Sequence, residues 1–104
     1  MLHVTTDASF AADTAQGVAL VDFYADWCGP CKVMLPRLEE LQSKLGESAK
    51  VMKINVDNDP NTASSFGIMS IPTMIVFKDG KPVEKFVGAQ DVSFLEAALR
   101  KYAA

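Results

Sequence analysis

The feature that most restricts the fold of this chain is a nearly uninterrupted apolar run at residues 18–25, in which Asp22 is the single charged side chain. Such a run lacks the alternation of a strand with one face in water, and it is typical of a strand buried on both faces of a sheet. Eight residues are too few to cross a bilayer as a helix. The run therefore predicts a buried strand over residues 18–24, covered by helices on both sides.

Helical and extended patterns alternate on either side of this strand. Further strands are expected at residues 2–5, 51–56, 71–77 and 82–87, and helices are expected to end near residues 15, 45, 67 and 102. The helix that ends near residue 45 carries an apolar stripe formed by Met34, Leu38, Leu41 and Leu45. Polar side chains suited to capping precede the other three helices: Thr6 or Asp7, Asp59 and Asp91.

The last two strands are joined by Asp79-Gly80, a dipeptide that between two apolar runs is a strong signal for a tight hairpin. Pro82 has no backbone donor, which marks the last strand as a sheet edge. The order β-α-β-α-β-α-β-β-α predicts an α/β protein with three α/β/α layers and a mixed central sheet of about five strands and four helices. Because no repeat or linker interrupts the sequence, residues 1–104 are expected to form one domain.

The charge balance narrows the choice of partners and compartment. Ten Lys and Arg face thirteen Asp and Glu, with no basic cluster to follow a phosphate backbone, so no nucleic acid is expected as a ligand. The first residues show no cationic segment followed by an apolar one, so no secretory signal is expected. The chain is predicted to be cytoplasmic, without a membrane partner, and the even spread of charge without a coiled-coil repeat favours a monomer.

Two cysteines, Cys28 and Cys31, flank Gly29 and Pro30 at the start of a predicted helix. A disulfide between them closes a loop of only four residues. In the chain-entropy model such a loop contributes about 2 kcal/mol, against about 4.7 kcal/mol for a loop of a hundred residues. The helix N-terminus also favours a thiolate. The spacing therefore favours redox chemistry, in which Cys28 is the accessible nucleophile and Cys31, one turn further in, resolves the mixed disulfide.

Three other uses of the cysteines compete with this hypothesis. A structural zinc site needs four ligands, and the chain adds only His3, so no metal is expected. A covalently bound haem needs His directly after the second cysteine, where Lys32 stands. Two buried structural thiols are the third alternative. The position of the pair between a strand and a helix of a βαβ pattern favours redox use.

The segment Val21–Lys32, with Trp27-Cys28-Gly29-Pro30-Cys31 at its centre, resembles the active-site segment of the thioredoxin family. Ser70–Thr73 followed by Phe77–Gly80 resembles the second landmark of that family, and the similarity extends over essentially the whole chain. Tyr24 stands where Trp is frequent in the family. The resemblance implies the thioredoxin fold and a thiol–disulfide oxidoreductase that reduces protein disulfides.

The same resemblance implies no bound cofactor, because the redox-active group is the Cys28–Cys31 disulfide itself. It also implies a thioredoxin reductase as partner, through which NADPH is used indirectly. Gly29 and Pro30 are expected to tune the redox pair by fixing the turn and by removing an amide donor from the sulfur. The alternative from another functional class is a binding module or assembly subunit whose surface carries the role and whose cysteines are incidental.

Asp22 and Lys53 are expected to serve the exchange chemistry. A carboxylate buried in an apolar strand has a raised pKa, so Asp22 is expected to accept the proton of the Cys31 thiol, through a water molecule. The alternative is a carboxylate that faces solvent or caps a neighbouring element. Lys53, in the next strand, resembles the family lysine that pairs with this Asp, and its alternative is a lysine at the surface.

Four further residues are expected to form the substrate-binding surface. Pro72 matches the family proline whose peptide bond is cis and which faces the cysteines, and the Ile71 backbone is expected to pair with an extended substrate segment. Trp27 is either part of this surface or a core aromatic. Gly88 has no side chain to obstruct a partner backbone. The methionines are expected to fill the core; they are Met34, Met52, Met69 and Met74.

Overall fold

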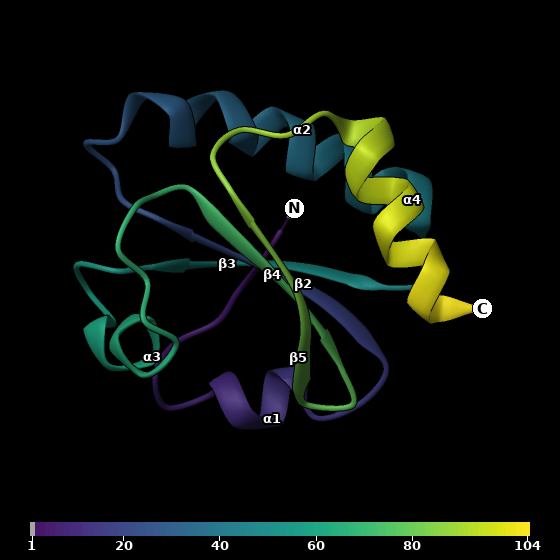
Figure 1. Ribbon diagram of the computed structural model, residues 1–104, viewed down its shortest axis with the longest axis horizontal. Coiled ribbons are helices and arrows are strands. Elements are labelled where there is room, and N and C mark those ends of the chain that lie inside the picture. Colours follow the sequence, from purple (N-terminus) through teal and green to yellow (C-terminus); the bar gives the residue numbers. More distant parts are fainter. Residues whose placement is uncertain (1) are drawn as a thin grey trace.

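The computed structural model describes residues 2–104, and its nine elements follow the predicted order (Figure 1). The strands are β1 (His3–Val4), β2 (Val18–Tyr24), β3 (Lys50–Asn55), β4 (Thr73–Lys78) and β5 (Lys81–Val87). The helices are α1 (Phe10–Thr14), α2 (Gly29–Leu45), α3 (Pro60–Ser65) and α4 (Val92–Ala103). The prediction of an α/β fold with a five-stranded sheet and four helices is confirmed.

The five strands form one mixed sheet in the order β1-β3-β2-β4-β5, with the apolar strand β2 at its centre. β1 and β2 run parallel to β3, whereas β4 runs antiparallel to β2 and to β5. Asp79 and Gly80 both have positive φ angles, as the predicted two-residue hairpin requires. Pro82 lies in the edge strand β5, opposite Phe77 and beside a register shift, so its missing donor leaves the central ladder intact.

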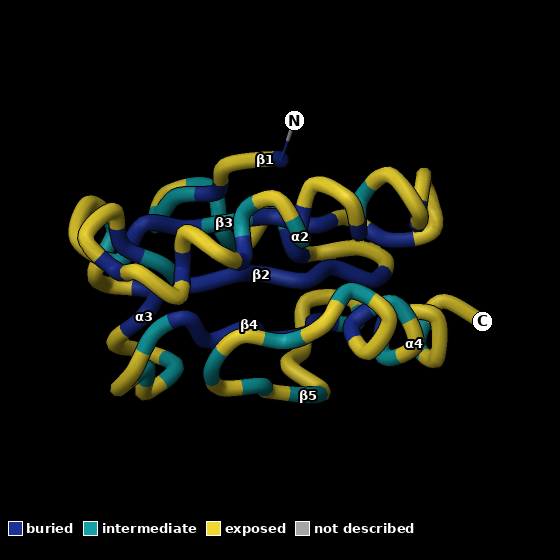
Figure 2. The backbone as a smooth tube through the Cα atoms, turned by 90° about the horizontal axis from the view of Figure 1, so that it is seen from above, coloured by how far each residue is buried: buried dark blue, intermediate teal, exposed yellow. Residues whose placement is uncertain are grey.

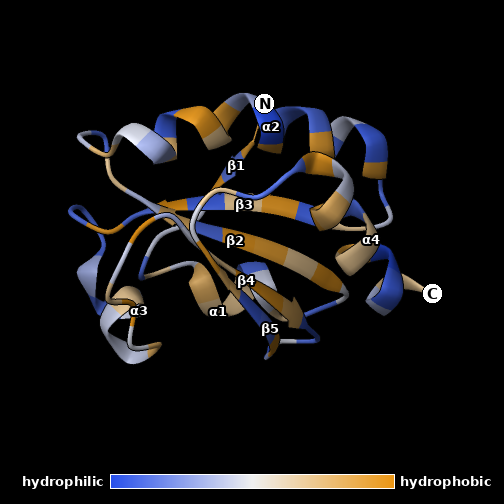
Figure 3. Cartoon of the chain, turned by 45° about the horizontal axis from the view of Figure 1, so that its top comes forward, coloured by the Kyte–Doolittle hydropathy of each residue, from blue (hydrophilic) through white to orange (hydrophobic). Residues whose placement is uncertain are grey.

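Helices cover both faces of the sheet, because β2 is apolar on both sides. Figure 1 shows α2 and α4 on one face and α1 and α3 on the other, and Figure 2 shows β2 in the dark blue of buried residues. The orange band along β2 in Figure 3 reflects the same composition. Val18 and Leu20 belong to the core against α2 and α4, whereas Val21 and Phe23 belong to the core against α1 and α3. Since side chains alternate along a strand, Asp22 lies on the α2 and α4 face.

The N-terminal caps differ from the sequence prediction. The first helix begins at Phe10 rather than directly after Asp7, although Thr6, the other predicted cap, accepts the Ser9 N–H at 3.1 Å in the turn before it. Asp7 caps α3 instead: its carboxylate accepts hydrogen bonds from the backbone N–H groups of Asn61 and Thr62, at 3.1 and 2.8 Å. The pKa of Asp7 lies below its ordinary value, chiefly because the side-chain hydroxyl of Thr62 donates to its carboxylate. Asp59, the predicted cap, precedes α3 but its side chain accepts the Asp7 N–H at 2.9 Å and makes no capping bond. The cap of α3 is instead Asp7, which is 55 residues from Thr62 along the chain.

Candidate active site

The two cysteines lie at the start of α2 and form a disulfide, with their Cα atoms 5.2 Å apart. Cys28 is the N-cap residue in an extended conformation, and its Sγ accepts the backbone N–H of Cys31 at 3.3 Å. Pro30 occupies the first turn and has no N–H of its own. The first turn of a 17-residue helix therefore directs one N–H group and the positive end of its dipole at Cys28.

The sulfurs are more buried than the sequence suggests. Cys28 is 5% exposed and Cys31 is 1% exposed, so the order of exposure is as expected, although Cys28 is not openly accessible. Both pack in a small apolar cluster with Ala25, against the partly buried Tyr24 and Ile71. In this disulfide form Cys28 is thus the more exposed of the two cysteines.

Two loops that are distant in the sequence meet beside Cys28. The carbonyl oxygen of Ile71 lies 3.8 Å from the Cys28 Sγ, and the Ile71–Pro72 peptide bond is cis, as the resemblance implied. Gly88 donates its N–H to the Pro72 carbonyl at 2.8 Å. Gly88 has a φ of 90°, and a Cβ at this position meets nothing within 4 Å. The loops before β4 and after β5 are thus held together next to the disulfide.

Trp27 is a surface residue and not a core aromatic, since 70% of it is exposed. Its indole Nε1–H donates to the carboxylate of Asp57 at 2.8 Å. Asp57 follows β3, and its own N–H is held by the side-chain oxygen of Asn55 at 2.9 Å. Sequence reasoning missed Asp57. Its position two residues beyond the end of the strand next to β2 is the signal that points to it.

Asp22 is completely buried on the helix face that carries the cysteines, and neither of its carboxylate oxygens has a hydrogen-bond partner. Burial raises the pKa of Asp22 from 3.8 to about 7, against a smaller lowering by the charge of Lys53. The group therefore exchanges a proton close to neutral pH. This combination of burial and a pKa raised to near neutrality is typical of a functional carboxyl group.

Lys53 lies directly opposite Asp22 in the parallel pairing of β2 with β3. Its side chain is half-buried, so it is neither a free surface lysine nor a closed ion-pair partner. The Nζ atom lies 5.4 Å from the ring centroid of Tyr24, the next residue of β2 on the same face. The lysine thus acts on Asp22 through space and contacts the aromatic ring.

Comparison with known proteins agrees with this geometry. The family model named Thioredoxin matches residues 1–101. The chain is 45% identical to a protein named Thioredoxin from Listeria monocytogenes over 98% of its length and 99% of the relative. It is also similar to proteins of that name from Bacillus subtilis (48% identical) and Staphylococcus aureus (50% identical), in both cases over 93% of each chain. The chain belongs to the thioredoxin family.

Membership of the thioredoxin family gives the chain its activity, which is thiol–disulfide exchange. The redox-active group is the Cys28–Cys31 disulfide, and thioredoxins carry no bound cofactor beyond it. Disulfide-containing proteins are the substrates that this family implies. Among residues 2–104 no group of three or more His, Cys, Asp or Glu side chains is arranged to hold a metal ion. None of the helices described there is long and apolar enough to span a bilayer.

The backbone of Gly29 does not have the special conformation expected of a glycine that fixes the turn between the cysteines. It does not have a positive φ angle, and a Cβ at its position meets nothing within 4 Å. Neither backbone conformation nor space therefore requires glycine at position 29. Both Gly29 and Pro30 are exposed, which is consistent with a surface that a partner approaches closely.

An apolar hollow lies beside the thioredoxin disulfide, between Trp27 and Ile71. Met69 lies on its rim and is 96% exposed, so the prediction that it fills the core is wrong. The other three methionines of that set are buried; they are Met34, Met52 and Met74. Met69 differs from them because it lies in the loop after α3, where Ile68 and Ile71 pack against the core and Met69 does not.

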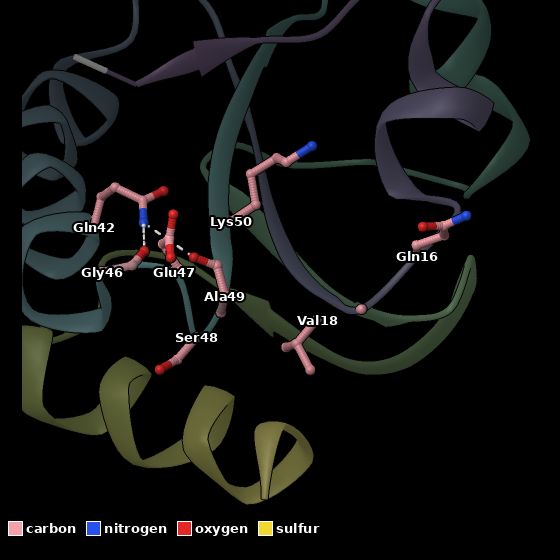
Figure 4. Close-up of a pocket in the computed structure, with 9 residues that line it drawn as sticks. Gln16, Val18, Gln42, Gly46, Glu47, Ser48, Ala49 and Lys50 are labelled. Carbon is pink, nitrogen blue, oxygen red and sulfur yellow. Dashed lines mark hydrogen bonds between the residues drawn. The ribbon is translucent and has the colours of Figure 1, made fainter.

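A second hollow lies at the far end of α2 from the disulfide (Figure 4). There the side-chain N–H groups of Gln42 donate to the carbonyl oxygens of Gly46 and Ala49, both at 3.0 Å, as the dashed lines in Figure 4 show. The oxygen of Gln42 accepts the N–H of Val51 at 2.7 Å. The amide of Gln42 thus stabilises the turn between α2 and β3 through three hydrogen bonds. No cysteine or methionine lines this hollow. The chemistry of the thioredoxin chain resides at the other end.

Proposed function

We propose that Cys28 attacks the disulfide of a protein substrate and that Cys31 resolves the mixed disulfide. In the reduced protein the Cys28 thiolate bonds to one substrate sulfur and releases the other as a thiol. Cys31 then loses its proton and bonds to Cys28, which releases the second substrate thiol. The substrate gains two electrons, and the Cys28–Cys31 disulfide is restored. The observation that carries the assignment is the Cys28 sulfur at the helix N-cap, accepting the Cys31 N–H.

The test compares two matched variants, Cys28→Ser and Cys31→Ser. Reduction of insulin by dithiothreitol is expected to be accelerated by the natural protein and by neither variant. Cys31→Ser is also expected to accumulate a mixed disulfide with a peptide disulfide, visible as an added mass that dithiothreitol removes. Cys28→Ser is expected to form none. Trapping by Cys28→Ser, or catalysis retained in it, would reverse the assignment.

Asp22 accepts the proton that Cys31 loses during resolution. Its complete burial, its unpaired oxygens and its pKa of about 7 support this role, because a base works best when its pKa is near the ambient pH. Lys53, opposite on β3, assists by favouring the charged form of the carboxyl. In single-turnover kinetics, resolution is expected to rise with a midpoint near pH 7, and Asp22→Asn is expected to abolish that midpoint while leaving attack by Cys28 intact. The same midpoint in Asp22→Asn would exclude the role.

Substrates bind across Trp27, Ile71, Pro72 and Gly88 as an extended segment. The hydrogen bond between Gly88 and Pro72 and the contact of Ile71 with Cys28 support this, since they join the two loops beside the sulfur. Ile71 precedes β4, so its backbone lies outside the sheet ladder and is suited to strand addition. Gly29 and Pro30 complete the surface and tune the redox pair. Gly88→Val is expected to raise KM for insulin with a smaller effect on reduction by dithiothreitol, which needs no such surface.

An NADPH-dependent thioredoxin reductase re-reduces the disulfide, and the chain works as a single-domain monomer in the cytoplasm. A reducing compartment is needed to keep the cysteine pair in its electron-donating form. A bacterial thioredoxin reductase is expected to consume NADPH when this protein and insulin are both present, and light scattering is expected to give the mass of one chain. A dimer mass, or no NADPH consumption, would contradict the respective proposal.

A further inference from the structure

Asp22 and Lys53 are opposite each other but do not form an ion pair. They are paired in the register of β2 and β3, and side-chain alternation directs both to the α2 face. Even so, both oxygens of Asp22 lack a hydrogen-bond partner. A buried carboxylate and an adjacent ammonium ordinarily meet, because each compensates the desolvation of the other. Another group must therefore hold the ammonium elsewhere.

That group is the ring of Tyr24. The Lys53 Nζ lies 5.4 Å from its centroid, within the range of a cation–π interaction. Tyr24 is the residue after Asp22 on the same face of β2, and it is half-buried, which strengthens the attraction by limiting competition from water. Tyr24 also lines a hollow together with Cys31, so the residue that contacts the lysine also borders the redox site.

We propose that Tyr24 is a positioning residue for disulfide exchange: its ring holds the ammonium group of Lys53 away from Asp22, so that the carboxyl group stays unpaired and can take up the proton that Cys31 loses. The proposal rests on the proposed role of Asp22 as the base for Cys31. The face of the ring attracts the Lys53 ammonium group but accepts no proton from it, so the lysine remains charged. Its charge then acts on Asp22 through space and not through a hydrogen bond.

Few other charged or titratable groups face Asp22. Its neighbour on β4 is Met74, and α4 contributes Leu95 and Leu99 to this core. From α2 come Met34 and, once the disulfide is reduced, the titratable Cys31. Asp26 and Lys32 lie at the exposed rim of the hollow beside Cys31 and Tyr24. Lys53 is the cation whose charge acts on the buried carboxyl, so its position decides how readily that carboxyl is protonated.

The experiment measures the pKa of Asp22 by NMR titration of its carboxyl carbon in the oxidised protein. Tyr24→Leu is expected to release Lys53 toward Asp22 and to lower that pKa by about one unit or more, the effect of an opposite charge within 4–6 Å. Tyr24→Phe keeps the ring and is expected to leave it unchanged. Wider access of water also lowers the pKa of a buried carboxyl, so Tyr24→Leu is repeated in a Lys53→Met background, where the lowering is expected to disappear.

Each outcome decides the matter. An equal lowering in both backgrounds would assign the effect to water access and overturn the proposal, as would no lowering in Tyr24→Leu. If Tyr24→Leu does not fold, Lys53→Met alone is decisive: it is expected to raise the pKa of Asp22 by less than about one unit, and a larger rise would mean that the two groups already pair closely.

The same variants separate this proposal from the role of Asp22. The pH midpoint of resolution by Cys31 is expected to move with the pKa of Asp22 in Tyr24→Leu. If the pKa moves and the midpoint does not, Tyr24 positions the lysine but Asp22 is not the base. If Asp22→Asn abolishes the midpoint and Tyr24→Leu leaves the pKa unchanged, Asp22 is the base and Tyr24 has no part in tuning it.

Discussion

Ionisation of Asp22 is expected to cost the oxidised protein several kcal/mol of stability. Burial raises the pKa of this carboxyl from 3.8 to about 7, and both of its oxygens are unpaired. At about 1.36 kcal/mol for each pKa unit, the difference corresponds to about 4 kcal/mol in the free energy of unfolding. Because the pKa is higher in the folded chain, this stabilisation is fully present below about pH 4. It declines as the pH rises and is lost above about pH 7.

Asp22→Asn removes the ionisation and keeps the size and polarity of the side chain. The stability difference between Asp22→Asn and the natural protein is therefore expected to increase in favour of the variant by about 2 kcal/mol between about pH 5.5 and about pH 8. The change in this difference is the informative quantity, because any constant effect of the amide cancels in it. All other titrating groups are shared by the two proteins and cancel as well.

The assay is urea unfolding of the oxidised proteins at several pH values, followed by circular dichroism and extrapolated linearly to water. Asp26→Asn removes an exposed aspartate close by and serves as the control for the loss of one negative charge. Its stability difference from the natural protein is expected to stay nearly constant over the same pH range. If the Asp22→Asn difference also varied by less than roughly 0.5 kcal/mol, the carboxyl would not have its raised pKa, and the case for it as a base would fail with it.

Three further predictions concern residues around the site and at a helix cap. Asp57→Ala removes the acceptor for the Trp27 indole and is expected to lower kcat/KM for insulin about fivefold, the equivalent of one hydrogen bond, while Tm changes little. Asp7→Ala is expected to lower the free energy of unfolding by about 1–2 kcal/mol, because it removes the cap of α3. The side chain of Asp91 makes no capping bond, so Asp91→Ala is expected to change the free energy of unfolding by less than about 0.5 kcal/mol. Equal losses for the two variants in urea unfolding would refute the role of Asp7 as a cap. Met69→Lys is expected to leave Tm unchanged, because the side chain is exposed. The added positive charge beside the hollow is expected to lower kcat/KM for disulfide peptides with flanking Lys or Arg relative to those with flanking Asp or Glu. An equal effect on both kinds of peptide would exclude Met69 from substrate choice.

The sequence predicted those features that depend on local pattern. The apolar run became the central strand, and the Asp79-Gly80 dipeptide became the hairpin turn. The features that it did not predict depend on contacts between distant segments. Asp7 caps a helix 55 residues further along because the loop before α1 lies against the start of α3, which no local pattern reports. The exposure of Met69 depends likewise on the path of one loop, not on its hydrophobicity.

The chemistry of the site was predictable only in part for the same reason. A charge in a buried strand indicated the raised pKa of Asp22, because burial of that strand follows from its composition. The position of the Lys53 ammonium was not predictable, since it depends on the competition between a carboxylate and an aromatic ring on the same face. The register of β2 and β3 places Asp22 opposite Lys53. The ring of Tyr24 then determines whether the two side chains form an ion pair.

The location of the site follows from two reversals of strand direction. The segment with Cys28 follows the C-terminal end of β2, and Asp57 follows the C-terminal end of the parallel strand β3. Because β4 is antiparallel to β2, the loop with Pro72 enters the sheet at this same end, where Thr73 pairs with Phe23. β5 reverses once more, so Gly88 leaves the sheet there, next to Val87 paired with Thr73. Four loops distant in sequence therefore converge on the disulfide. A parallel β4 would have placed Pro72 at the opposite end of the strands.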